Sequence, residues 1–106
     1  LFAMTLEPAD ISRNDSEIMS SYIFQAGALG RVRVRIQFTT KSPQRSSSDI
    51  EFCSFVKLGE NSNPDPTYRS LMLTRKENID SAQWQKAVSF FDRNLQSVKP
   101  SSTVTT

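Results

Sequence analysis

Three arginines alternate with apolar residues in the stretch Arg31-Val32-Arg33-Val34-Arg35. Alternate side chains of a β-strand point to the same face, so the arginines would stand about 6 to 7 Å apart on one face. That spacing is close to the phosphate spacing of an extended nucleic-acid strand, and guanidinium groups bind phosphates bidentately. The pattern indicates a phosphate-binding surface, or else the ordinary solvated face of an antiparallel sheet.

Other cationic and aromatic residues follow the arginine stretch. Lys41 and Arg45 belong to a serine-rich loop, residues 41–48, and two strands predicted after this loop place Phe55 and Tyr68 at outward positions. Aromatic rings stack on bases of any identity, at about 1 to 3 kcal/mol per base. The predicted site for single-stranded nucleic acid consists of Arg31, Arg33, Arg35, Lys41, Arg45, Phe55 and Tyr68.

The residue types needed for catalysis are missing from the sequence. It contains no histidine, no phosphate-binding glycine loop, no dinucleotide-binding motif and no nucleophile or metal motif. Asp49 and Glu51, the nearest approach to a carboxylate pair, are typical salt-bridge partners. We therefore expect a protein that is not an enzyme, with no catalytic residue, no metal ligand and no cofactor.

Composition limits the class of protein further. The chain has 106 residues, enough for one domain, and 13 basic against 11 acidic residues leave a net charge of +2. This charge is too small for a dedicated duplex binder, so any affinity for nucleic acid must come from local clustering. No apolar run approaches the roughly 20 residues of a membrane span, so no membrane is expected.

Two further features concern the origin of the chain. Cys53 has no partner for an internal disulfide, which favours a reducing, intracellular setting and predicts an unreactive thiol. The chain also begins without methionine, which suggests trimming or cutting from a longer precursor.

Local patterns predict the first strands. Residues 1–7 alternate as a short edge strand that ends at Pro8, and residues 10–17 are turn-like. Residues 15–25 fit either a strand or a helix. We favour a strand for the second half, because residues 26–30 form a short glycine-bearing connection that would close a hairpin onto the arginine strand. The arginine strand, residues 31–40, would direct Val32, Val34, Ile36 and Phe38 into the core.

Two more strands are predicted after the serine-rich loop. In residues 49–58, Ile50, Phe52, Val56 and Leu58 are expected on the inner face, with Glu51, Cys53, Phe55 and Lys57 on the other. Glu51 would then neutralise one arginine of a neighbouring strand. Residues 59–66 form a loop, and residues 67–75 a strand with Leu71 and Leu73 inward.

A helix is predicted over residues 81–98. Asp80 and Gln83 resemble a capping box, and the apolar stripe consists of Trp84, Ala87, Val88, Phe91 and Leu95. The prediction is therefore an α+β domain over residues 1–99, in which a mainly antiparallel sheet of four to five strands is covered by one C-terminal amphipathic helix. Residues 100–106 form a polar tail.

This order of elements resembles the repeat of the Pur and Whirly group of single-stranded nucleic-acid-binding proteins. The resemblance lies in the passage from Arg69-Ser70-Leu71-Met72-Leu73-Thr74 to residues 80–91. It implies a curved sheet that presents basic and aromatic residues to bases, with the helix packed behind it.

A second resemblance is to picorna-like virus capsid proteins. It is carried by residues 21–34, in which an aromatic segment runs through glycine into the basic strand. This resemblance implies the alternative function, a structural or protein-interaction subunit of a larger assembly. Such a subunit would form a homo- or hetero-oligomer through its strand edges.

Overall fold

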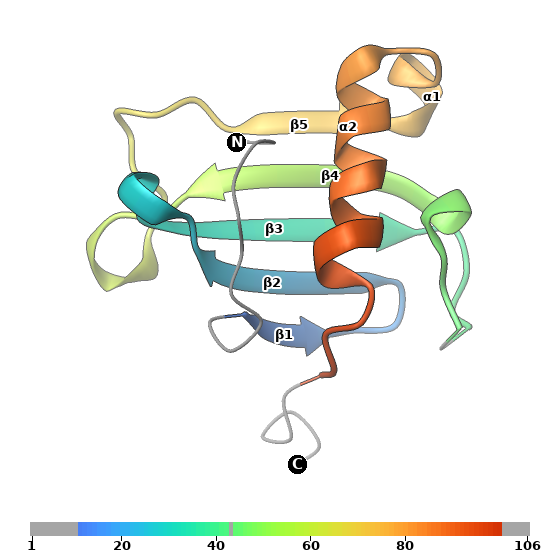
Figure 1. The fold of residues 1–106 in the computed structure, drawn as a ribbon, viewed down its shortest axis with the longest axis horizontal. Helices are drawn as coiled ribbons and strands as arrows, with labels where there is room; N and C mark the ends of the chain where they lie inside the picture. Colours follow the sequence, from blue (N-terminus) through green and yellow to red (C-terminus); the bar gives the residue numbers. More distant parts are fainter. Residues whose placement is uncertain (1–10, 43, 101–106) are drawn as a thin grey trace.

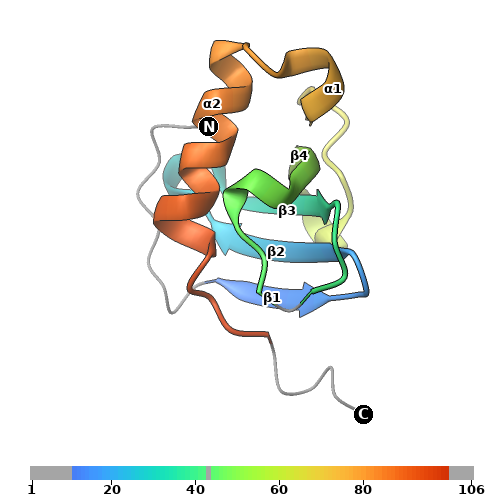
Figure 2. The same cartoon turned by 90° about the vertical axis from the view of Figure 1, so that its right-hand side faces the viewer.

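The computed structural model describes residues 11–42 and 44–100. They form a five-stranded antiparallel sheet in which each strand pairs with its neighbours in the sequence (Figure 1). The strands are β1 (Ser12–Asp15), β2 (Met19–Gln25), β3 (Arg31–Phe38), β4 (Ile50–Lys57) and β5 (Leu71–Thr74). A C-terminal helix crosses one face of the sheet (Figure 2), which confirms the predicted α+β fold.

The arginine stretch forms the central strand. Along β3, Val32, Val34, Ile36 and Phe38 are buried, as predicted. The predicted hairpin between β2 and β3 is also confirmed, and the Ala26 N–H donates to the Gly30 carbonyl at 2.7 Å. Gly27 and Gly30 have φ angles of +54° and +90°, a region that favours glycine, so the connection depends on both residues.

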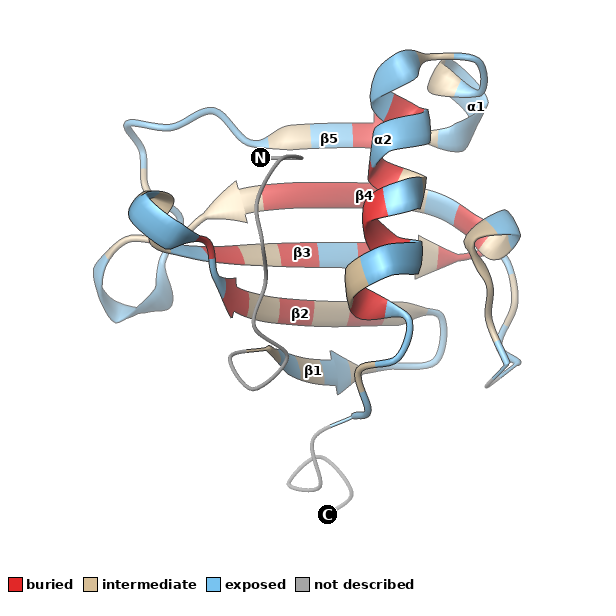
Figure 3. Ribbon diagram, viewed as in Figure 1, coloured by how far each residue is buried: buried red, intermediate tan, exposed pale blue. Residues whose placement is uncertain are grey.

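The helix begins one residue later than predicted. Ser81, not Asp80, caps α2 (Ala82–Phe90), because its Oγ accepts hydrogen bonds from the Gln83 and Trp84 N–H groups at 3.1 and 3.4 Å. Buried residues gather where α2 crosses the strands (Figure 3). No helix in the described part of the chain is long and apolar enough to cross a membrane.

A π-helical turn, Phe91–Leu95, continues α2. In a π-helix each N–H donates to the carbonyl five residues back, one residue further than in an α-helix. The Gln96 N–H accordingly donates to the Phe91 carbonyl at 3.0 Å. Two consecutive aromatic residues, Phe90 and Phe91, contact the sheet where α2 passes into this turn, although the predicted stripe included only the second. The Phe90 ring lies 5.8 Å from Phe24 and 5.6 Å from Phe55, and the Phe91 ring lies 5.9 Å from Phe38.

The predicted faces of β4 are wrong for most of the strand. Gln37 pairs with Phe52 but Phe38 pairs with Ile50, so Glu51 is one extra residue in a β-bulge. One extra residue moves every later side chain to the opposite face. Cys53 and Phe55 are therefore buried, whereas Phe52 and Val56 are only partly buried. Ile50, which precedes the bulge, is buried as predicted.

Two other elements differ from the predictions, and a third decides between the strand and the helix that the sequence allows. Ser12–Asp15 forms β1 instead of a turn, because it pairs along β2. In the ambiguous residues 15–25, the strand favoured for the second half is confirmed as β2, and none of these residues is helical. The last strand is limited to Leu71–Thr74 and runs into a short helix, α1 (Arg75–Asn78). The strand predicted over residues 1–7 lies outside the described residues, as does most of the predicted tail.

Candidate nucleic-acid interface

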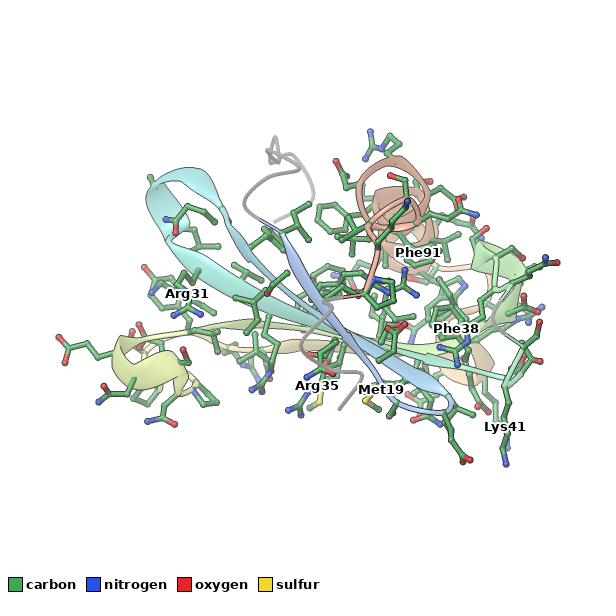
Figure 4. The ribbon with its side chains drawn as sticks, turned by 90° about the horizontal axis from the view of Figure 1, so that it is seen from below. Met19, Arg31, Arg35, Phe38, Lys41 and Phe91 are labelled. Carbon is green, nitrogen blue, oxygen red and sulfur yellow. The ribbon has the colours of Figure 1, made fainter. Side chains whose placement is uncertain are left out.

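One face of the sheet carries α2, and no described helix or strand covers the opposite face, which we call the open face (Figure 2). In Figure 4, Arg35 and Met19 point away from the helix, while Phe38 and Phe91 lie between the two layers. Alternation and strand register give the residues that β2 to β5 contribute to the open face. They are Met19, Ser21, Ile23, Gln25, Arg31, Arg33, Arg35, Gln37, Phe52, Ser54, Val56, Met72 and Thr74.

The predicted arginine row is present on the open face. Arg31 and Arg35 are exposed, whereas Arg33 is partly buried between its cross-strand neighbours Ile23 and Val56. Burial, together with the nearby charge of Arg35, lowers the pKa of Arg33. The Arg33 Nε is buried without a hydrogen-bond partner in the described part of the chain.

No acidic side chain in the described part of the chain neutralises the arginine row. Among residues 11–42 and 44–100, ion pairs join Arg13 to Asp15, Lys41 to Glu17 and Lys57 to Asp65, and none includes Arg31, Arg33 or Arg35. The expected pairing of Glu51 with an arginine does not occur, because Glu51 stands in the bulge. Of these three arginines, only Arg31 has a side-chain hydrogen-bond partner among the described residues, donating to Ser62 Oγ at 2.9 Å.

The two predicted stacking residues do not join the arginine row. Phe55 is 2% exposed and packs edge-on against Phe90, so its assignment as a base-stacking residue is wrong. Tyr68 is 52% exposed, but it lies in the turn before β5, with Lys57 Nζ 5.0 Å from its ring centroid. Lys57 pairs with buried Val32, so this pair belongs to the helix-covered side of the sheet.

The two loop cations contact other groups and lie beyond the strands of the open face. The Arg45 guanidinium lies 4.8 Å from the ring centroid of buried Phe38 and donates hydrogen bonds to the Ser42 and Glu17 carbonyls. Lys41 Nζ lies 3.6 Å from the carboxylate of Glu17, and both side chains are exposed. Of the residues predicted for the site, only the three arginines share the open face.

Sequence reasoning missed the aromatic residue that does lie on the open face. Phe52 is partly exposed and stands opposite Gln37, next to the arginine row. The run from Phe52 to Val56 is apolar at both odd and even positions, so alternation does not show which face is which. No local signal marks the bulge that reverses the faces.

Burial makes the single thiol unsuitable for chemistry. Cys53 is 3% exposed, and burial raises its pKa to about 12. Within the described residues, no three acidic, histidine or cysteine side chains are grouped so that they could hold a metal ion.

Comparison of the chain with protein-family models, with curated proteins and with solved structures finds no match.

Proposed function

We propose that this protein is a non-enzymatic binding module that holds single-stranded nucleic acid on its open face. The observation that carries the proposal is a row of three arginines, without ion-pair partners among the described residues, on a sheet face that no described element covers. The class of function is the one that the resemblance to the Pur and Whirly group implies.

Each part of the open face suits a part of a nucleic-acid strand. Arg31, Arg33 and Arg35 are spaced to contact successive phosphates, and Phe52 replaces Phe55 as the residue on which a base stacks. Stacking on Phe52 requires an unpaired base, because bases inside a duplex already stack on their neighbours. Single strands are therefore favoured over duplexes.

Salt dependence tests the role of the arginines. If each contacts one phosphate, log affinity should fall against log salt with a slope of about −2, from about −0.7 per contact. Replacing the two exposed members, Arg31→Gln with Arg35→Gln, should flatten the slope by about 1.4. Fluorescence anisotropy with a labelled single-stranded oligonucleotide measures both slopes.

The matched control removes two exposed cations from the other layer of the molecule. Lys86 and Arg93 lie on the C-terminal helix and its π-helical turn. The variant Lys86→Gln with Arg93→Gln has the same net charge as the arginine variant but should keep the slope of the unmodified protein. No binding at low salt, or equal slopes for both variants, would contradict the proposal.

One observation favours the second candidate function, a protein-interaction subunit. Met72 is 64% exposed on the open face, with apolar Met19, Ile23 and Val56 on the neighbouring strands. The edge strands β1 and β5 are only four residues long, so they offer little backbone for pairing with another chain. A partner protein would therefore bind the open face.

Size-exclusion chromatography with light scattering separates the two functions. An assembly subunit would form an oligomer without nucleic acid, and Met72→Asp would dissociate it, because burying an unpaired carboxylate is costly. A nucleic-acid-binding module stays monomeric in this experiment, and Met72→Asp leaves its elution unchanged.

A further inference from the structure

A hollow of about 310 Å³ lies at one end of the open face, beside α1. Gln37, Phe52 and Thr74 stand side by side on β3, β4 and β5 and contribute to its wall. Glu51, Lys76 and Glu77 complete the lining. Ligand pockets span about 300 to 1,000 Å³, so this volume suits one small planar group.

The hollow continues the arginine row. Gln37 is two residues beyond Arg35 on the same strand, a step of about 6 to 7 Å along the open face. A nucleotide whose phosphate is held by Arg35 would therefore have its base within reach of the Phe52 ring.

The charges around the hollow disfavour a phosphate. Glu51 and Glu77 contribute two negative charges against one positive charge from Lys76, and none of the three forms an ion pair with another described residue. Carboxylate oxygens are acceptors only, and among the bases they accept from amino groups such as N4 of cytosine. Thymine presents a carbonyl oxygen at the same position, which a carboxylate repels.

A second observation also points to a ligand. Thr74 lines the hollow, and its hydroxyl is buried without a hydrogen-bond partner among the described residues. Buried hydroxyls in folded proteins nearly always have a partner, so a rotation of the Thr74 side chain that turned this hydroxyl into the hollow would gain it a hydrogen bond with a polar ligand atom. The Gln37 amide adds a donor and an acceptor to the same wall.

We infer that the hollow formed by Gln37, Glu51, Phe52, Thr74, Lys76 and Glu77 binds one unpaired base that bears an amino group, such as cytosine, and discriminates against thymine. This inference rests on the proposed function, because the base is delivered by a strand held on the arginine row. It adds a base preference to a surface whose phosphate contacts carry no sequence information.

The test compares oligodeoxycytidylate with oligothymidylate of equal length, about 12 nucleotides, which is within the range that single-strand-binding sites cover. Both bases are pyrimidines, so the comparison isolates the amino group. At low salt and neutral pH, we expect the cytosine oligomer to bind about fivefold more tightly or better, since hydrogen bonds to charged groups are among the stronger ones. Fluorescence anisotropy measures this ratio.

Two double variants assign the preference to the hollow. Glu51→Ala with Glu77→Ala should reduce the ratio to about 1, even though losing two negative charges strengthens binding of both oligomers. The control, Glu60→Ala with Asp92→Ala, changes the net charge equally at exposed positions that do not line the hollow, and should keep the ratio.

The outcomes separate the two proposals. Equal affinity for both oligomers in the unmodified protein, or a ratio that survives Glu51→Ala with Glu77→Ala, would overturn the hollow as a base site and leave the arginine row intact. Binding of neither oligomer at low salt would overturn the proposed function and this inference together.

Discussion

Arg33 is the residue at which stability and the proposed binding oppose each other. Its guanidinium is partly buried beside Ile23 and Val56, and its Nε has no partner in the described part of the chain. Burial lowers the pKa of Arg33, which means that the folded state disfavours the charged form. Such a residue costs stability in the free protein, and in the proposed complex its guanidinium would gain a phosphate as a partner.

Replacing Arg33 by methionine should therefore keep or raise stability while weakening binding. Methionine is also long and unbranched, so it can replace the apolar stem of the arginine. Because the substitution removes an unpartnered buried polar group, it should stabilise the fold by about 0 to 1 kcal/mol. Urea unfolding measures this change, and the anisotropy slope should flatten by about 0.7. A loss of more than about 1 kcal/mol would mean that Arg33 has a stabilising partner in solution.

Cys53 makes a prediction about alkaline pH. Its pKa is raised from an ordinary value of 9.0 to about 12 by burial, so the folded protein keeps the proton longer than the unfolded chain does. The contribution of the thiol to stability is fully present below about pH 9 and is lost between about pH 9 and 12. Burial also raises the pKa of Tyr22, which acts in the same direction.

The variant Cys53→Ala separates the thiol from Tyr22. Its free energy of unfolding should fall less steeply above pH 9 than that of the unmodified protein, as measured by urea titrations at several pH values. In the unmodified protein, a thiol reagent at pH 8 should label Cys53 only after unfolding. Rapid labelling of the folded protein would show that β4 opens locally.

At the scale of elements, the bulge at Glu51 lets Ile50 and Phe52 lie on opposite faces of β4, so that Phe52 belongs to the open face. Ile50 now pairs with Phe38 and Phe52 with Gln37, and Glu51 between them has no partner on β3. Without Glu51 the same two pairs would follow each other directly, as in a regular strand. Deleting Glu51 alone should thus keep every later side chain of β4 on its present face. Deleting Ser54, which lies in the regular part of the strand, should turn Phe55 out of the core.

The two deletions should differ strongly in stability. We expect the loss of Glu51 to cost about 0.5 to 3 kcal/mol, the ordinary range for a single change, and the loss of Ser54 to prevent cooperative folding. Near-ultraviolet circular dichroism during urea unfolding distinguishes these outcomes. Equal damage from both deletions would show that the bulge does not set the faces of β4.

The whole molecule divides the work between two layers. Aromatic packing of α2 and its π-helical turn on Phe24, Phe38 and Phe55 stabilises the sheet from one side. The helix therefore supports the arginine row without contributing to it. This arrangement leaves the open face without a covering helix or strand among the described elements.

Ligand binding should raise thermal stability for single strands more than for duplexes. At 100 times the dissociation constant, a ligand adds about 2.7 kcal/mol, which for a domain of this size corresponds to a rise in Tm of about 10 degrees or more. Differential scanning fluorimetry with a single-stranded oligonucleotide should show this shift. The same sequence in duplex form should shift Tm much less, and equal shifts would indicate binding to phosphates alone.

Some features of this protein were determined by the sequence alone. Alternation in Val32 to Phe38 and helical spacing from Trp84 to Leu95 predicted the central strand, the helix and the α+β fold, because burial of one face imposes a local period. The same local period placed the three arginines together on the opposite face.

Tertiary structure alone decided the rest of the candidate site. Glu51 is left unpaired by the register between β3 and β4, and this register is set by residues that are distant in the sequence. As a result Phe52 lies on the open face and Phe55 in the core, although both occupy one apolar run. Pairing between strands is non-local, so no window of sequence around the run contained that information.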